Sequence, residues 1–84
     1  MKVVFATSAL KDYYDFQEKD PKVFKRINRI LRNIKKTPFD GLGKPEPLKY
    51  NWTGYWSRRI TQEHRLVYKV TEDKIFVAQC KFHY

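Results

Sequence analysis

Residues 44–68 read KPEPLKYNWTGYWSRRITQEHRLVY, and they open the part of the chain that we expect to form a β-sheet. Short runs of aromatic and branched residues alternate here with turn residues, which is the pattern of strands joined by tight turns. Alternation of apolar and polar residues continues towards the end of the chain. The predicted strands cover residues 48–50, 55–61, 64–70 and 75–82.

Upstream of this stretch, the sequence predicts a further strand and a first helix. Residues 2–6 form a short apolar strand, after which Thr7 or Ser8 can cap a helix that ends near residue 19. The helical spacing puts four residues on one side of this helix, namely Leu10, Tyr13, Tyr14 and Gln17.

A second helix has clear start and stop signals. Asp20 and Pro21 supply a cap and a proline at the first helical position, and Pro38 ends the helix. Its apolar stripe consists of Val23, Ile27, Ile30 and Ile34. The opposite face is entirely basic and carries Lys22, Lys25, Arg26, Arg29, Arg32, Lys35 and Lys36. Two helices before a run of strands predict an α+β fold in which both helices pack on one face of a twisted antiparallel sheet.

Length and composition predict one folded domain over residues 1–84 with anionic partners. A net charge of +9 favours nucleic acid, an anionic membrane surface or an acidic protein. No apolar run is long enough for a membrane span or a signal peptide, so we expect a cytoplasmic protein without a membrane partner. The single cysteine, Cys80, excludes an intrachain disulfide and a multi-cysteine metal site, and its apolar surroundings predict an inert core thiol. We expect no cofactor.

Several residues in and after the opening stretch suit the cleavage of RNA without a metal. That reaction needs a base for the ribose 2′-OH, an acid for the departing 5′-oxygen and cations for the charge on phosphorus. The candidates are an acid between two prolines, arginines on neighbouring strands and a terminal His-Tyr pair: Glu46, Arg58, Arg59, Arg65, His83 and Tyr84. Taken singly, each also fits a rigid turn, a solvated face or a frayed chain end. Spacing alone supports no more than a basic RNA-binding domain.

The sequence leaves the position of His83 relative to Arg65 open. If the hairpin loop at residues 71–74 has an even number of residues, Arg65 shares a sheet face with Phe82 and Tyr84. An odd number puts Arg65 on the same face as His83.

The chain as a whole resembles the YoeB toxins of bacterial toxin–antitoxin systems, within the RelE/ParE superfamily. The resemblance rests on TPFDGLGKPEPLKYNWTGYWSRRITQEHRLVY at residues 37–68 and CKFHY at residues 80–84. It implies a RelE-like fold, an endoribonuclease that cuts messenger RNA in the A site of the 70S ribosome, and inhibition by an acidic YefM-like antitoxin. It also implies the roles of the site residues: Glu46 as general base, His83 as general acid, Arg65 as phosphate clamp, Tyr84 as support, and Lys49 and Arg59 as further phosphate contacts.

The resemblance extends to the remaining features and leaves alternatives. The basic face of the second helix suits docking on ribosomal RNA, although it also fits a solvated helix face. Trp52, Tyr55 and Trp56 could stack on a base, with at least one Trp expected in the core, and His64 is expected to be structural. A homodimer is left open. Two other function classes compete: a non-catalytic ParE-like toxin that binds a protein such as DNA gyrase, and an RNA-binding module without chemistry.

Overall fold

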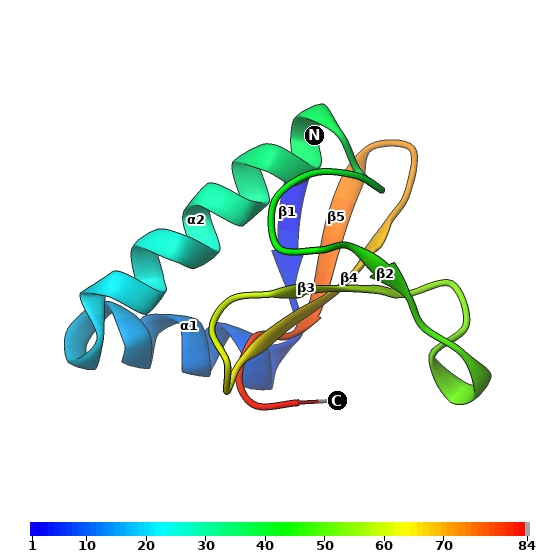
Figure 1. Cartoon of the computed structure of the whole chain (residues 1–84). Helices are drawn as coiled ribbons and strands as arrows, with labels where there is room; N and C mark the ends of the chain where they lie inside the picture. Colours follow the sequence, from blue (N-terminus) through cyan, green and yellow to red (C-terminus); the bar gives the residue numbers. More distant parts are fainter. Residues whose placement is uncertain (84) are drawn as a thin grey trace.

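The computed structural model describes residues 1–83, in which two helices pack on one face of a five-stranded sheet (Figure 1). The predicted α+β class is confirmed. The elements are β1 (Lys2–Phe5), α1 (Thr7–Lys19), α2 (Pro21–Lys36), β2 (Glu46–Pro47), a 3₁₀ turn (Tyr50–Trp52), β3 (Trp56–Arg59), β4 (Arg65–Val70) and β5 (Lys74–Gln79). Tyr84 lies outside the described residues.

The sheet is mostly antiparallel and has the strand order β1-β5-β4-β3-β2. The pairs formed within the C-terminal half are all antiparallel, whereas β1 pairs with β5 in parallel. The sequence did not indicate this parallel pair. Because two helices separate β1 from the other strands, no hairpin forces β1 into the antiparallel direction.

Helix α2 forms as its sequence pattern predicts. The Asp20 side chain accepts a hydrogen bond from the Val23 N–H at 3.4 Å, and Pro21 occupies the first helical position. Ile27 and Ile30 of the apolar stripe are fully buried. This strongly amphipathic helix has only one face that can be buried, so its orientation is decided by its sequence.

Helix α1 differs from the prediction in its cap and its buried side. The cap position is Ala6, so the predicted hydroxyl cap is wrong. Ala9 and Phe16 are buried, whereas Leu10 and Tyr14 are exposed. Apolar residues lie on more than one side of this helix, and the contacts with the sheet and α2 select which side is buried.

The core lies between the helices and the sheet. Its fully buried members come from α2, β4, β5 and the residue after β5: Ile27, Ile30, Ile34, Leu66, Tyr68, Ile75, Val77 and Cys80. The side chains of the opposite sheet face are therefore the ones left available for a functional site.

The strands of the C-terminal half are shorter than predicted, and one of them is misplaced. Strand pairing occurs at Glu46–Pro47 rather than at residues 48–50. Tyr50 has a φ of +58°, which ends the extended backbone and begins the 3₁₀ turn. The predicted strand at residues 48–50 is wrong because residue type does not reveal a left-handed backbone at a tyrosine.

Arg58 anchors the loop between α2 and β2 to the sheet. Its side chain is fully buried, and all five guanidinium N–H groups donate hydrogen bonds. The acceptors are the Tyr68 hydroxyl, the Asn33 side-chain oxygen and the main-chain oxygens of Thr37, Asp40 and Leu42. The prediction of an ordered loop at residues 37–47 is confirmed. Arg58 itself is structural, so its grouping with the candidate phosphate-binding arginines is wrong.

Candidate active site

Strand register brings three of the predicted site residues to the same face of the sheet. Glu46 pairs with Ser57 across β2 and β3, and Arg59, two residues further along β3, pairs with Arg65 on β4. Residues directly opposite each other, and residues two apart on one strand, point to the same side. Glu46, Arg59 and Arg65 therefore share the face opposite to that of Arg58, whose side chain lies in the interior.

Arg59 and Arg65 place two positive charges directly opposite each other on neighbouring antiparallel strands. Like charges in this arrangement are destabilising when nothing lies between them. Arg65 is held in place by main-chain oxygens, with Nη1 donating to Thr61 O at 2.7 Å and to Gln62 O at 3.2 Å. Arg59 is exposed. An anion bound at this pair would remove the repulsion and gain charge-assisted hydrogen bonds.

His83 lies beside Arg65. The His83 Nε2 is 3.3 Å from Gln62 O, the same carbonyl oxygen that accepts a hydrogen bond from Arg65 Nη1. The His83 side chain is exposed. The side chains of His83, the predicted general acid, and Arg65, the predicted phosphate clamp, thus contact the same carbonyl oxygen. Tyr84 is the remaining member of the predicted set and falls outside residues 1–83.

A β-bulge decides where the C-terminal tail runs. Val70 pairs with Ile75, so an even number of residues lies between these paired positions, but the register shifts between Val67 and Tyr68 so that Val67 pairs with Gln79. The extra residue reverses the alternation of faces beyond it. Loop parity alone therefore could not place Arg65 relative to the tail.

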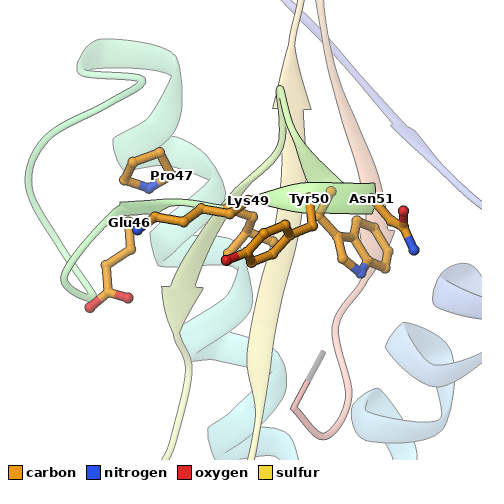
Figure 2. A pocket seen from close by; sticks show the side chains of 7 residues that line it. Glu46, Pro47, Lys49, Tyr50 and Asn51 are labelled. Atoms are coloured by element: carbon orange, nitrogen blue, oxygen red, sulfur yellow. The ribbon is translucent and has the colours of Figure 1, made fainter.

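Glu46 and Lys49 line a shallow hollow at the end of β2, as Figure 2 shows. Its volume is about 560 Å³, and both charged side chains are exposed. Tyr50 lines the same hollow and is 91% exposed. An acid, a cation and an aromatic ring thus lie next to one another on the outer edge of the sheet, where β2 is the last strand.

The predicted stacking residues are less available than Tyr50. Trp56 packs against the core, and its ring centroid lies 4.8 Å from that of Phe39. This confirms that one tryptophan has a packing role. The rings of Trp52 and Tyr55 pack edge to face, with their centroids 5.2 Å apart. The sequence pattern did not single out Tyr50, because its positive φ and its 91% exposure are properties of the folded chain.

The basic face of α2 is open to solvent. Arg26 is the half-buried member, and its Nη2 donates to Arg59 O at 3.4 Å. The exposed members are Lys22, Lys25, Arg29, Arg32, Lys35 and Lys36. Three of them, Arg29, Arg32 and Lys36, line a second hollow of about 370 Å³. The docking role predicted for this face requires such exposure.

The buried Tyr68 and the half-buried Tyr13 have perturbed ionisation. Burial raises the pKa of Tyr68, and the hydrogen bond from Arg58 partly opposes that shift. Burial also raises the pKa of Tyr13, whose hydroxyl donates to the Asn28 side chain. Both phenols consequently stay neutral, and neither lies on the face that carries Glu46 and Arg65.

His64 is buried, in agreement with its predicted structural role. The centroid of its ring lies 5.1 Å from the ring centroid of Phe16 in α1 and 5.5 Å from that of Phe82 in the tail. Its Nδ1 accepts a hydrogen bond from the Phe82 N–H at 2.9 Å.

The described part of the chain offers neither a metal-binding cluster nor a helix that could span a membrane. Across residues 1–83, His, Cys, Asp and Glu side chains do not gather in groups of three or more that could hold a metal ion. Neither helix in that range is long and apolar enough to cross a membrane.

The same fold occurs in bacterial toxins of known structure. The YoeB/ParE toxin from Agrobacterium tumefaciens matches with a TM-score of 0.97 and 52% identity over 100% of both chains. The toxin in a YoeB-YefM complex from Staphylococcus aureus matches with a TM-score of 0.94 and 47% identity, over 100% of this chain and 98% of that chain. The fold therefore defines the class as a small toxin of the RelE/ParE type.

Sequence comparison identifies the family within that class. Residues 5–84 match the YoeB-like toxin of bacterial type II toxin-antitoxin systems. A Toxin YoeB from Escherichia coli is 51% identical over 84 residues, which is 100% of each chain. The chain therefore belongs to the YoeB toxin family and is the toxin component of a type II toxin–antitoxin system.

Proposed function

We propose that this toxin is a ribosome-dependent, metal-independent endoribonuclease that acts in the cytoplasm as a single domain over residues 1–84. It cleaves messenger RNA in the A site of the 70S ribosome and so inhibits translation. The observation that carries the proposal is the strand register that puts Glu46, Arg59 and Arg65 on one sheet face. The chemistry of these side chains supports the proposal as well. A carboxylate and two opposed arginines are the groups expected at a site where a bond to phosphorus is broken.

Each proposed role follows from the chemistry of the side chain. The Glu46 carboxylate takes the proton of the ribose 2′-OH, whose oxygen attacks the adjacent phosphorus. The protonated His83 imidazole gives its proton to the 5′-oxygen as the P–O bond breaks. Arg65 and Arg59 neutralise the charge that builds up on the phosphoryl oxygens, and Lys49 contacts a neighbouring phosphate. The products are a 2′,3′-cyclic phosphate and a free 5′-hydroxyl.

The aromatic contact with substrate is assigned to Tyr50. Stacking of a base on an aromatic ring contributes on the order of 1–3 kcal/mol. Tyr50 is 91% exposed and lines the hollow that also contains Glu46. A base stacked there would hold its nucleotide next to the proposed general base.

The proposed partners follow from charge and from relatives. Solved relatives include a YoeB-YefM complex and a YoeB dimer, both from Staphylococcus aureus. For this chain we propose an acidic YefM-like antitoxin, which a net charge of +9 would attract, and a homodimer. The exposed basic face of α2 is proposed to dock on ribosomal RNA.

A translation assay with a defined message tests the catalytic roles. Glu46→Gln and His83→Ala should each lower A-site cleavage by about 100-fold or more, because each removes one proton-transfer group. Glu72→Gln serves as the matched control, because it removes one negative charge, as Glu46→Gln does, from an exposed residue of the hairpin between β4 and β5. Replacing the 2′-OH at the scissile nucleotide with a 2′-O-methyl group should also stop cleavage.

Other outcomes separate the competing function classes. Cleavage that survives Glu46→Gln or His83→Ala would refute the assigned roles. Intact messenger RNA together with inhibited DNA supercoiling would indicate a ParE-like toxin that acts on DNA gyrase. Salt-sensitive RNA binding with no cleavage would indicate a binding module without chemistry.

A further inference from the structure

The tail that carries His83 has an unfavourable backbone conformation. Phe82, the residue immediately before His83, has a φ of +60°. This left-handed region is sterically unfavourable for any residue with a Cβ atom, and it is rarer still for bulky side chains. Such a conformation persists only where the surrounding structure holds it in place. The Phe82 side chain is itself exposed, so burial of its ring does not account for the conformation.

Hydrogen bonds hold the backbone of Phe82 on both sides. Its N–H donates to His64 Nδ1 at 2.9 Å, and its carbonyl oxygen accepts from the Arg65 N–H at 3.0 Å. The Gln79 side chain adds a longer bond to the same oxygen at 3.4 Å. The two short contacts come from consecutive residues at the start of β4. The tail is therefore attached to the strand that carries the proposed phosphate clamp.

The hydrogen bond from Phe82 selects the tautomer of His64. A backbone N–H can only donate, so Nδ1 must present its lone pair as the acceptor. The proton then lies on Nε2, which is 3.0 Å from a carboxylate oxygen of Glu63. The nearby negative charge of Glu63 favours a proton on Nε2, and this tautomer leaves Nδ1 free to accept.

Packing fixes the ring orientation of His64 as well. The residue is 7% exposed, and Phe16 of α1 meets the ring edge to face. Because the ring cannot turn freely, its Nδ1 stays directed at the Phe82 N–H. His64 joins helix α1, strand β4 and the tail at one point.

We propose that His64 is the positioning residue of the active site: it holds Phe82 in the left-handed conformation that brings His83 to Gln62 O beside Arg65. This inference rests on the proposed function, in which His83 is the general acid. His64 itself lies beneath the tail and acts on the reaction only through His83. Its removal should leave the binding of RNA intact and slow the proton transfer.

Two amide substitutions with opposite geometry test the contact. In His64→Asn the amide oxygen can take the place of Nδ1 and still accept from Phe82, whereas in His64→Gln the amide reaches the position of Nε2 instead. Amide hydrogen exchange, followed by NMR on the free toxin, should show Phe82 protected in the wild type and in His64→Asn. In His64→Gln the Phe82 amide should exchange about tenfold faster or more. Equal exchange in all three proteins would overturn the inference.

Single-turnover cleavage on programmed ribosomes tests the consequence. His64→Gln should lower the rate at saturating toxin by about tenfold or more, since a small displacement of a catalytic group is costly. The half-saturating toxin concentration should stay within about twofold, and His64→Asn should recover most of the rate. A fall in rate of the same size in both variants would indicate a general loss of stability and overturn the positioning role.

A double-variant comparison separates positioning from other effects. In a His83→Ala background, His64→Gln should cause no further loss, because the group that it positions is absent. The same loss in both backgrounds would contradict the inference. If the wild type itself does not cleave, the proposed function fails, and the exchange comparison still decides whether His64 holds the tail.

Discussion

Burial in the core raises the pKa of the Cys80 thiol to about 12, and repulsion from Asp12 adds to the shift. The thiol is fully buried and donates to Ala9 O at 3.4 Å. This confirms the predicted inert core thiol. At the scale of single residues, the chemistry of this side chain is set by the low polarity around it.

The shifted thiol predicts a loss of stability at alkaline pH. The unfolded chain releases the Cys80 proton near pH 9, and the folded chain keeps it until about pH 12. Between these values the unfolded state binds fewer protons, so this group lowers the free energy of unfolding by about 1.4 kcal/mol per pH unit as pH rises. Urea unfolding of the wild type and Cys80→Ala at pH 8 and pH 10.5 measures the difference.

The comparison with Cys80→Ala removes other contributions. Tyr13 and Tyr68 also have raised pKa values and destabilise the fold in the same pH range, but both proteins contain them. Stability should fall less steeply with pH in Cys80→Ala. Equal slopes for the two proteins would show that the thiol does not titrate differently on folding.

At the scale of elements, Arg58 joins a loop, a helix and a strand. Arg58→Met keeps the length of the side chain but leaves the oxygens of Thr37, Asp40 and Leu42 without their donors. Buried acceptors that lose their partners are costly, and we expect a loss of about 3 kcal/mol or more in the free energy of unfolding. Urea denaturation checks this value.

The neighbouring residue provides a matched control for Arg58→Met. Arg59→Met on the same strand replaces an exposed arginine that lies opposite Arg65. Its stability should stay within about 0.5 kcal/mol of the wild type or rise slightly, because repulsion is relieved. Similar losses for both variants would contradict the anchoring role of Arg58.

The 3₁₀ turn after β2 carries a second prediction at this scale. Tyr50 adopts a φ of +58°, a region that asparagine tolerates better than tyrosine does. Tyr50→Asn should therefore fold at least as stably as the wild type while it lowers affinity for programmed ribosomes by about fivefold or more, through loss of the stacked ring.

Ring-retaining and remote variants control the Tyr50 experiment. Tyr50→Phe keeps the aromatic face and should bind like the wild type. Tyr14→Ala removes an exposed tyrosine from α1, far along the chain, and should also leave binding unchanged. Wild-type affinity in Tyr50→Asn, measured by titration with fluorescent ribosomes, would rule out stacking at this position.

At the scale of the whole molecule, the charge of the basic face of α2 should control the salt dependence of ribosome binding. Changing Arg29, Arg32 and Lys36 together to glutamine should weaken binding at physiological salt. It should also reduce the slope of log affinity against log salt by about 0.7–0.9 for each phosphate that the variant no longer neutralises. Binding titrations at several salt concentrations measure both effects.

A variant with the same net charge shows whether position matters. Lys2, Lys11 and Lys74 are exposed residues on elements other than α2. Their joint replacement by glutamine changes the net charge equally and should reduce the slope much less. Identical slopes for the two triple variants would mean that overall charge, rather than docking of α2, governs binding.

Sequence patterns predict the α+β class and the orientation of α2, and the sequence contains the candidate site residues. The fold class and the orientation of α2 follow from local rules: the strong amphipathic pattern of residues 21–36, the Asp20 cap, and apolar alternation in the last strands. The resemblance to YoeB toxins supplied the family, which the comparisons confirm.

Which of these candidate residues come together depends on how the chain folds. Arg58 and Arg59 are adjacent in sequence, yet one is the buried anchor of a loop and the other faces solvent. The bulge at Val67 and the hydrogen bonds of the tail bring His83 to Arg65. Strand faces depend on register, and register depends on contacts between segments far apart in the chain. No local pattern in the sequence contains that information.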